Sequence, residues 1–142
     1  MKGPLSLRRE RFYRKYGVMI EYPVPASVFT SPLPFSPATK VGNLIFVSGQ
    51  ASTNERGEIV SDTFENEFRR SMENVRRILR ACGSDLDKVA RVNSYVKNAS
   101  DLPQYNQLYR EYFKPPYPAR TTITNCLGKV LFEIDVIAVT ND

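Results

Sequence analysis

Two residues in the C-terminal third of the chain have side chains suited to metal-free chemistry on a carboxylate-bearing substrate. Arg120 follows a stiff Tyr-Pro-Ala segment, and its planar guanidinium can hold a carboxylate through two hydrogen bonds. Glu133 lies in an apolar run, where a carboxyl group tends to have a raised pKa and can accept a proton from water. From the local pattern alone, a structural salt bridge from Arg120 is an equally good interpretation.

Weaker candidates lie elsewhere in the chain. Ser48 and Gly49, at the expected end of a strand, offer a hydroxyl and an unshielded backbone N–H that can hold an anion, although a plain turn also explains them. Asn106 is expected in a helix, where asparagine is more often solvated than catalytic. Asp135 shares a strand face with Glu133 and is expected to be solvated near the strand end.

The elements that position these residues follow from the hydrophobic periodicity. Arg120 and Thr122 are two residues apart on a strand predicted over 119–125, so a guanidinium and a hydroxyl point to one face. Glu133 lies in the last strand, whose other face is wholly apolar. The remaining strands are predicted over 40–48, buried on both sides, and over 58–60 and 89–97. The order strand, strand, helix, strand, helix, strand, strand indicates an α+β domain.

Two helices complete this order. The first has a capping-box pattern at Asp62 and Glu65 and a stop at Gly83. Its polar face is rich in arginine, which we interpret as a solvated surface in preference to an anion-binding one. The second helix is opened by Asp101 and by the proline two residues later.

Composition restricts the possible mechanisms. The chain of 142 residues has the size of one domain, and it contains no histidine and only two cysteines. Every mechanism that needs an imidazole base or ligand is therefore excluded, and we expect neither a metal nor a cofactor. Because no apolar run has the length of a membrane span and no secretory signal is evident, we expect no membrane partner and a cytoplasmic location.

The N-terminal segment holds the chain's excess positive charge. Residues 1–17 carry six basic side chains against one acid, a balance of +5 that equals the net charge of the whole chain. We expect 1–17 to be a short helix or a disordered arm, followed over 18–34 by a proline-rich connector with a possible edge strand at 18–22. The domain itself, expected over 35–142, has no excess charge to hold a nucleic acid backbone.

Five motifs, taken in order, resemble the RidA (YjgF) family of reactive-intermediate imine deaminases. The resemblance covers roughly residues 33–139. The motifs are Pro34-Phe35-Ser36-Pro37-Ala38, the stretch from Val41 to Gln50, Val92 to Lys97, Tyr117-Pro118-Ala119-Arg120-Thr121, and Phe132 to Ala138. The Val-Ser-Gly-Gln and Pro-Ala-Arg stretches are jointly specific at this separation.

The resemblance implies a fold, an assembly and a reaction. The fold is chorismate-mutase-like, with a curved mixed sheet carrying two helices on one face, assembled as a homotrimer with its sites in clefts between subunits. Arg120 would bind the carboxylate of a 2-imino acid, helped by the backbone at Gly49. Glu133 would activate the water that attacks the imine carbon, which releases ammonia and a 2-oxo acid. Ser48 and Asn106 match site positions of the family and would line the cleft.

The chain also departs from the family pattern. Phe35 stands where many members have a tyrosine, and Thr122 stands where they often have a cysteine. The spacing from Arg120 to Glu133 is two residues shorter than usual. These changes leave the physiological substrate open and predict a cleft that is less polar on one side.

The basic residues of 1–17 leave a second function open. Some family members are described as ribonucleases or translation inhibitors, and the basic residues of 1–17 are interleaved with Phe12 and Tyr13. A ligand-sensing or RNA-contacting role of this arm is the alternative. A solubilising or subunit-packing role is the simpler interpretation of a basic arm, and nucleic acid is not expected elsewhere on the chain.

Overall fold

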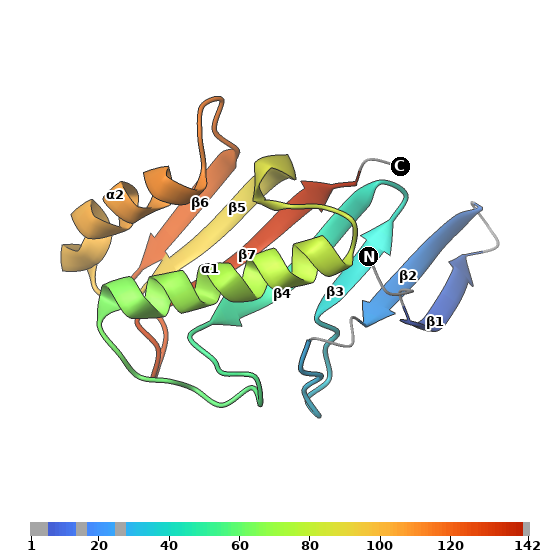
Figure 1. The fold of residues 1–142 in the computed structure, drawn as a ribbon, viewed down its shortest axis with the longest axis horizontal. Helices are drawn as coiled ribbons and strands as arrows, with labels where there is room; N and C mark the ends of the chain where they lie inside the picture. Colours follow the sequence, from blue (N-terminus) through green and yellow to red (C-terminus); the bar gives the residue numbers. More distant parts are fainter. Residues whose placement is uncertain (1–5, 14–16, 25–27, 141–142) are drawn as a thin grey trace.

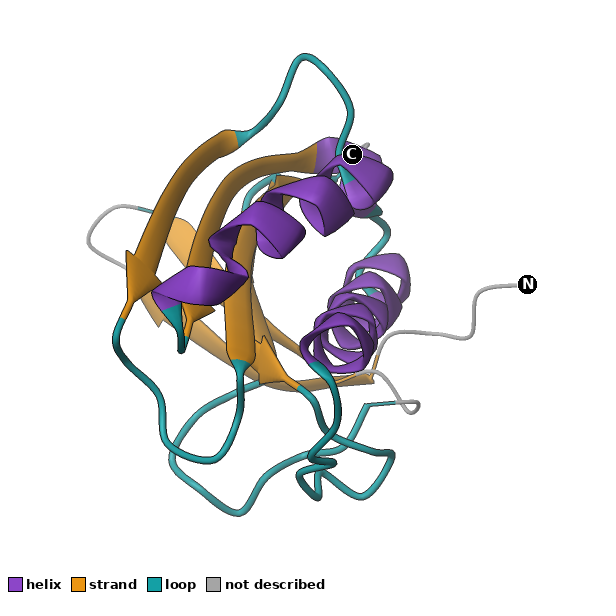
Figure 2. Ribbon diagram, turned by 90° about the vertical axis from the view of Figure 1, so that its left-hand side faces the viewer, coloured by secondary structure: helices purple, strands orange, loops and turns teal. Residues whose placement is uncertain are grey.

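A seven-stranded mixed sheet with two α-helices on one face forms the domain (Figures 1 and 2). The computed structural model describes residues 6–13, 17–24 and 28–140. The strands are β1 (Ser6–Tyr13), β2 (Val18–Val24), β3 (Ala38–Val41), β4 (Leu44–Ala51), β5 (Val89–Val96), β6 (Ala119–Thr124) and β7 (Phe132–Val139). The helices are α1 (Phe64–Ala81) and α2 (Leu102–Tyr112), with short 3₁₀ turns at Leu86–Lys88 and Ala99–Asp101.

The strand order in the sheet is β1-β2-β3-β4-β7-β5-β6. Only β5 and β6 run parallel, because α2 connects them by a crossover, and all other neighbours are antiparallel. The last strand of the chain, β7, therefore lies in the middle of the sheet between β4 and β5. This placement brings Glu133 next to segments that are far away in sequence.

The core lies between the helices and the face of the sheet that they cover. Apolar residues of α1 at intervals of three and four pack on it, and Phe68, Met72 and Val75 are fully buried. Phe132 of β7 is also fully buried, with its ring centroid 4.7 Å from that of Phe68. The predicted apolar face of the last strand is confirmed by this packing.

Helix α1 ends as predicted but begins one residue later. Thr63, not Asp62, is the N-cap, and its hydroxyl accepts a hydrogen bond from the backbone N–H of Asn66. Asp62 instead accepts from the N–H of Thr63, in front of the helix. At the other end Gly83 has a φ of 82°, and the N–H of Ser84 donates to the carbonyl of residue 79 in a Schellman motif.

The charged face of α1 is a solvated surface, as predicted, and some of its arginines form ion pairs on it. Arg69 pairs with Glu65 and also with Glu111 of α2. Arg80 pairs with Asp85 beyond the C-terminus of the helix.

The N-terminal prediction is wrong for the part of the segment that the structure describes. Residues 6–13 form the strand β1, which pairs with β2 in an antiparallel hairpin, and are neither a helix nor a disordered arm. Residues 1–5 and 14–16 lie outside the described residues. The strand predicted at 18–22 is confirmed, but it is not at the edge, because β1 covers its outer side.

The strand predicted over 40–48 is in fact a hairpin. Gly42, with a φ of 58°, and Asn43 form a two-residue turn between β3 and β4. In β4 one side is buried and the other is not: Ile45 and Val47 face the core, whereas Phe46 is exposed. The strand continues to residue 51 through a bulge after Val47.

The strand predicted over 58–60 does not form. Only an isolated bridge joins Thr53 and Ile59. The segment is held in a tight loop instead, because Asn54 accepts from the N–H of Arg56 and of Glu58.

Candidate active site

Arg120 projects from β6 towards α2. The register pairs it with Val92 of β5, which is fully buried on the helix-covered side of the sheet. Its guanidinium carbon lies 5.1 Å from the ring centroid of Tyr105 and 4.7 Å from that of Tyr109. Two buried aromatic rings therefore hold one side of the guanidinium through cation–π contacts and leave its other side to solvent.

The interpretation of Arg120 as a structural salt bridge is not supported. Within the described part of the chain, no carboxylate lies at ion-pair distance from Arg120. Four of the five arginines of α1 show the contrast, since Arg69, Arg70, Arg76 and Arg80 have acidic partners. Arg120 is thus a positioned cation without a protein anion.

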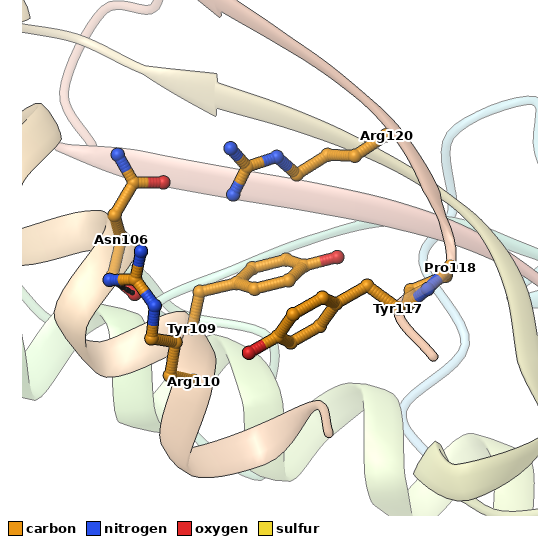
Figure 3. Close-up of a pocket in the computed structure, with 6 residues that line it drawn as sticks. All are labelled: Asn106, Tyr109, Arg110, Tyr117, Pro118 and Arg120. Carbon is orange, nitrogen blue, oxygen red and sulfur yellow. Dashed lines mark hydrogen bonds between the residues drawn. The ribbon is translucent and has the colours of Figure 1, made fainter. Parts of the chain in front are cut away.

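A cavity of about 260 Å³ opens in front of Arg120 (Figure 3). It is lined by Asn106, Tyr109, Arg110, Tyr117, Pro118 and Arg120, so its wall contains two guanidinium groups and no acid. Asn106 and Arg110 are one helical turn apart on α2 and face the same opening. The cavity is therefore suited to an anion of small size.

The hydroxyl of Tyr109 adds an unused donor to this region. It is buried and has no hydrogen-bond partner among the described residues. Burial raises the pKa of Tyr109 to about 12, so the phenol keeps its proton. Because an unpaired buried hydroxyl costs free energy, a ligand oxygen within reach of it would gain a favourable hydrogen bond.

Thr122 lies on the same face as Arg120, as predicted. Its Oγ1 is 3.4 Å from the hydroxyl of Tyr105, which donates to Ser94 Oγ at 2.6 Å. Tyr105 is therefore in contact both with the Thr122 hydroxyl and with the guanidinium of Arg120.

Glu133 projects from β7 to the face of the sheet that no helix covers. Its neighbours Phe132 and Ile134 are fully buried on the helix side, so alternation turns Glu133 away from it. The side chain lies against Gly49, where an added Cβ would be only 2.7 Å from Glu133 Oε1. Half-burial and then the negative charge of Asp135 raise the pKa of Glu133.

Asp135 is not merely solvated, contrary to the expectation. Asn93 Nδ2 donates to its Oδ1 at 2.9 Å, and the hydroxyl of Tyr95 donates to its Oδ2 at 3.1 Å. These two bonds fix a second carboxylate on the same strand face as Glu133. Because Asn93 and Tyr95 belong to the paired strand β5, that strand holds in place the negative charge that helps to raise the pKa of Glu133.

Ser48 directly precedes Gly49 in β4, and Phe35 lines the same cavity as Gly49. The Ser48 hydroxyl donates to the carbonyl of Ser36 at 2.5 Å. The backbone N–H of Ser48 donates to the carbonyl of Pro37 at 3.0 Å. Ser48 therefore anchors the preceding segment and is not an open anion holder. Phe35, Gly49 and Glu133 line a second cavity of about 360 Å³.

The predicted site residues thus form two groups that one chain does not bring together. Arg120, Asn106 and Thr122 face α2, whereas Glu133 is on the uncovered face of the sheet. Gly49 belongs with Glu133. Arg120 and Glu133 of the same chain therefore line two different cavities.

The sequence reasoning missed three residues of the Arg120 cavity. Arg110 could have been found from its position four residues after Asn106, which places both on one helical face. Tyr109 and Tyr117 could not have been found in this way. The contact of Tyr109 with Arg120 depends on the crossover that lays α2 over β6, and Tyr117 reaches the cavity from the segment before β6.

The described residues contain no group of three or more Cys, Asp or Glu side chains placed to hold a metal ion. No helix in this part of the chain is long and apolar enough to cross a membrane. The cytoplasmic location stays a prediction.

Comparison with known proteins assigns the chain to a family. A family model described as endoribonuclease L-PSP matches residues 27–140, which begin after β2. The chain is 36% identical over 112 residues to "Protein mmf2, mitochondrial" of Schizosaccharomyces pombe, covering 79% of this chain and 86% of that protein. It is 32% identical over 106 residues to the 2-iminobutanoate/2-iminopropanoate deaminase of Dermatophagoides farinae, covering 70% and 83%.

Solved structures agree with the sequence matches. The crystal structure of RidA from an Antarctic Psychrobacter species has a TM-score of 0.72 and 28% identity, and the match covers 80% of this chain and 94% of that one. The chain belongs to the RidA (YjgF) family. The mixed sheet with two helices is the fold that its structural neighbours share.

Proposed function

We propose that the protein hydrolyses 2-imino acids to 2-oxo acids and ammonia. Water adds to the imine carbon, the nitrogen takes up the protons, and the C–N bond breaks, so that R–C(=NH)–COO⁻ and H₂O become R–CO–COO⁻ and NH₃. The imine is already electrophilic, so positioning and one proton transfer supply most of what the reaction needs. The deaminase named among the relatives supports this choice.

Arg120 is the proposed anchor for the substrate carboxylate, and its unpaired guanidinium is the observation that carries the proposal. The rings of Tyr105 and Tyr109 hold it in place, and the cavity before it contains a second arginine and no acid. A carboxylate bound here gains two charge-assisted hydrogen bonds without displacing a protein partner. Asn106, at the same opening, is the proposed polar contact beside it.

Glu133 is the proposed base for the attacking water. Its raised pKa makes the carboxylate a better proton acceptor than an exposed glutamate. Gly49 leaves room for the carboxylate, and its backbone is the proposed further contact to the substrate. Phe35 and Ser48 complete this side, Phe35 as a wall and Ser48 as the anchor of the segment that carries it.

A complete site then needs two copies of the chain. Arg120 and Glu133 are on opposite sides of the sheet, so one copy would supply the anchor and its neighbour the base. The uncovered face offers a surface for this contact, because Leu44, Phe46 and Ile123 are exposed on it at 41%, 38% and 47%. We therefore propose the homotrimer with sites in clefts between subunits.

Imine decay tests the reaction. The imine is generated in situ by an amino-acid oxidase and trapped with semicarbazide, and active enzyme lowers the yield of semicarbazone. Arg120→Ala and Glu133→Gln are each expected to lower kcat/KM by about 100-fold or more. Arg80→Ala removes a surface arginine of α1 and serves as the matched control. Decay that the wild-type protein does not accelerate, or that is indifferent to Arg120→Ala, would contradict the proposal.

Mixed assemblies test whether sites are shared between copies. When Arg120→Ala and Glu133→Gln chains are refolded together in equal amounts, some interfaces combine the intact arginine with the intact glutamate. Random mixing in a closed ring gives about one quarter of the wild-type sites. Recovery to this level supports the shared site, and no recovery, with mixed trimers verified by mass spectrometry, would contradict it.

The alternative function is RNA contact through residues 1–17. The description of the matching family model as an endoribonuclease is the observation in its favour. Binding of single-stranded RNA would fall steeply with salt and vanish when residues 1–17 are removed. Unchanged imine hydrolysis in that truncated chain would separate the two functions.

A further inference from the structure

The cavity beside Glu133 is larger and more apolar than a three- or four-carbon imino acid requires. Its volume is about 360 Å³, roughly the share of twelve water molecules in the liquid, whereas iminopropanoate has only six heavy atoms. The same cavity contains Glu133 and Gly49, so the space is continuous with the proposed reacting centre. A substrate bound at Glu133 would therefore have room for a larger side chain.

Exposed apolar side chains gather at this cavity. Of the nine large hydrophobic side chains that are exposed among the described residues, four line it. These four, Phe29, Leu33, Phe35 and Ile59, have exposed fractions of 47%, 63%, 50% and 48% and are called here the apolar shelf. Solvated apolar groups concentrated at one opening favour a ligand with an apolar surface.

Local contacts hold the shelf in place without a ligand. The ring of Phe29 lies so close to Gly57 that an added Cβ would be 2.4 Å from it, and Gly57 has a φ of 75°. The N–H of Phe35 donates to the carbonyl of Leu33 at 2.8 Å, which closes a tight turn. A shelf that is already formed gives up little conformational entropy when a ligand binds.

Charge in the cavity does not favour a second anionic group on the ligand. Arg77 of α1 lines the cavity, but Glu55 lines it too, and Arg77 Nη1 donates to the Asn74 side chain at 3.2 Å. The Arg120 cavity, by contrast, contains cations and no acid.

We infer that the preferred substrates are 2-imino acids with a bulky apolar side chain, branched or aromatic, which lies on the apolar shelf while the imine carbon faces Glu133. This inference rests on the proposed imine hydrolysis and narrows its substrate class. Each methylene placed in an apolar pocket adds roughly tenfold or more to discrimination. We expect kcat/KM for the imines of leucine and phenylalanine to exceed that for the alanine imine by at least about tenfold.

The test compares three imines made by one D-amino-acid oxidase from D-alanine, D-leucine and D-phenylalanine, with semicarbazide as the trap. Leu33→Asp places a charge on the most exposed position of the shelf, and Leu33→Met keeps its apolar volume as the matched control. We expect Leu33→Asp to lower the leucine-to-alanine ratio of kcat/KM by about tenfold and Leu33→Met to leave it near that of the wild type.

The outcomes separate the two proposals. Hydrolysis of the alanine imine with no gain for the bulky imines overturns the inference and leaves the proposed function standing. A bulky-substrate preference that Leu33→Asp does not alter overturns the role of the shelf. Loss of the assembly in Leu33→Asp, seen by light scattering, also overturns it, because the shelf would then be a contact between copies. Failure to hydrolyse any imine overturns both proposals.

Discussion

Replacing Gly49 with alanine would place a methyl group against the carboxylate of Glu133. The new Cβ would be 2.7 Å from Oε1 and 3.2 Å from Cδ of that side chain. To reach the 3.4 Å at which ordinary contacts begin, the carboxylate has to move by about 0.7 Å. A displacement of this size at a catalytic base costs about 10- to 100-fold in rate, or about 1.4–2.7 kcal/mol of transition-state stabilisation.

The same substitution is expected to leave the fold intact. The backbone of Gly49 is outside the left-handed region, and the group in the way is the far end of a flexible side chain. Alanine also restricts the unfolded chain, so the free energy of unfolding should change by less than about 1 kcal/mol. Activity and stability are therefore expected to separate.

Imine decay measures activity, and urea unfolding measures stability. Gly128→Ala is the matched control, because an added Cβ there meets no atom within 4 Å. We expect kcat/KM to fall in the Gly49 variant alone, with equal midpoints of unfolding. A Gly49→Ala protein with wild-type kcat/KM would refute the idea that Glu133 acts from the position seen in the structure.

Three further predictions concern charge. Asp135→Asn removes one of the two causes that raise the pKa of Glu133; because the base works in its ionised form, the acidic limb of the kcat/KM profile should shift to lower pH. Arg120→Lys keeps the charge but loses the two-pronged fork, and we expect KM to rise about tenfold in initial-rate assays. The buried carboxylate of Glu67 accepts hydrogen bonds from the backbone N–H of Leu131 at Oε1 and from that of residue 62 at Oε2. In Glu67→Gln one of these N–H groups faces an amide NH₂ and loses its acceptor. We expect the free energy of unfolding in urea to fall by about 1–3 kcal/mol.

Control variants and contradicting results can be stated for these three substitutions. Asp87→Asn removes an exposed acid elsewhere, and an acidic limb that moves equally in both variants would contradict the role given to Asp135. For Arg120→Lys, an unchanged KM would argue against a two-point grip on the carboxylate. Glu65→Gln changes the exposed neighbour of Glu67 on α1, and an equal loss of stability in both would contradict the importance of the buried bonds.

Local rules predicted the elements that are long and strongly periodic. The apolar repeat of α1 and its stop at Gly83 depend on interactions within one helix and its cap, so sequence reasoning placed that end correctly. The start of the helix depends on which side-chain oxygen accepts a hydrogen bond from the first free N–H groups. That oxygen belongs to Thr63 and not to Asp62.

The errors fall where pairing partners decide the structure. Gly42 and Asn43 could be read as part of one long apolar run, and only the pairing of β3 with β4 makes them a turn. Residues 6–13 have no strong period of their own, and the hairpin with β2 supplies the hydrogen bonds that make them a strand. Residues 58–60 lack such a partner and form one bridge only.

The candidate site divides in the same way. The ordered motifs were enough to identify the family. The side-chain types at Arg120 and Glu133 and the lack of histidine led to the proposed chemistry, which stays a prediction. Tertiary structure alone decided that the two residues face opposite sides of one sheet, because a strand's faces acquire a direction only when the helices cover one of them. It also decided that Arg120 has aromatic rings and no acid beside it, since α2 and β6 meet only through the crossover from β5.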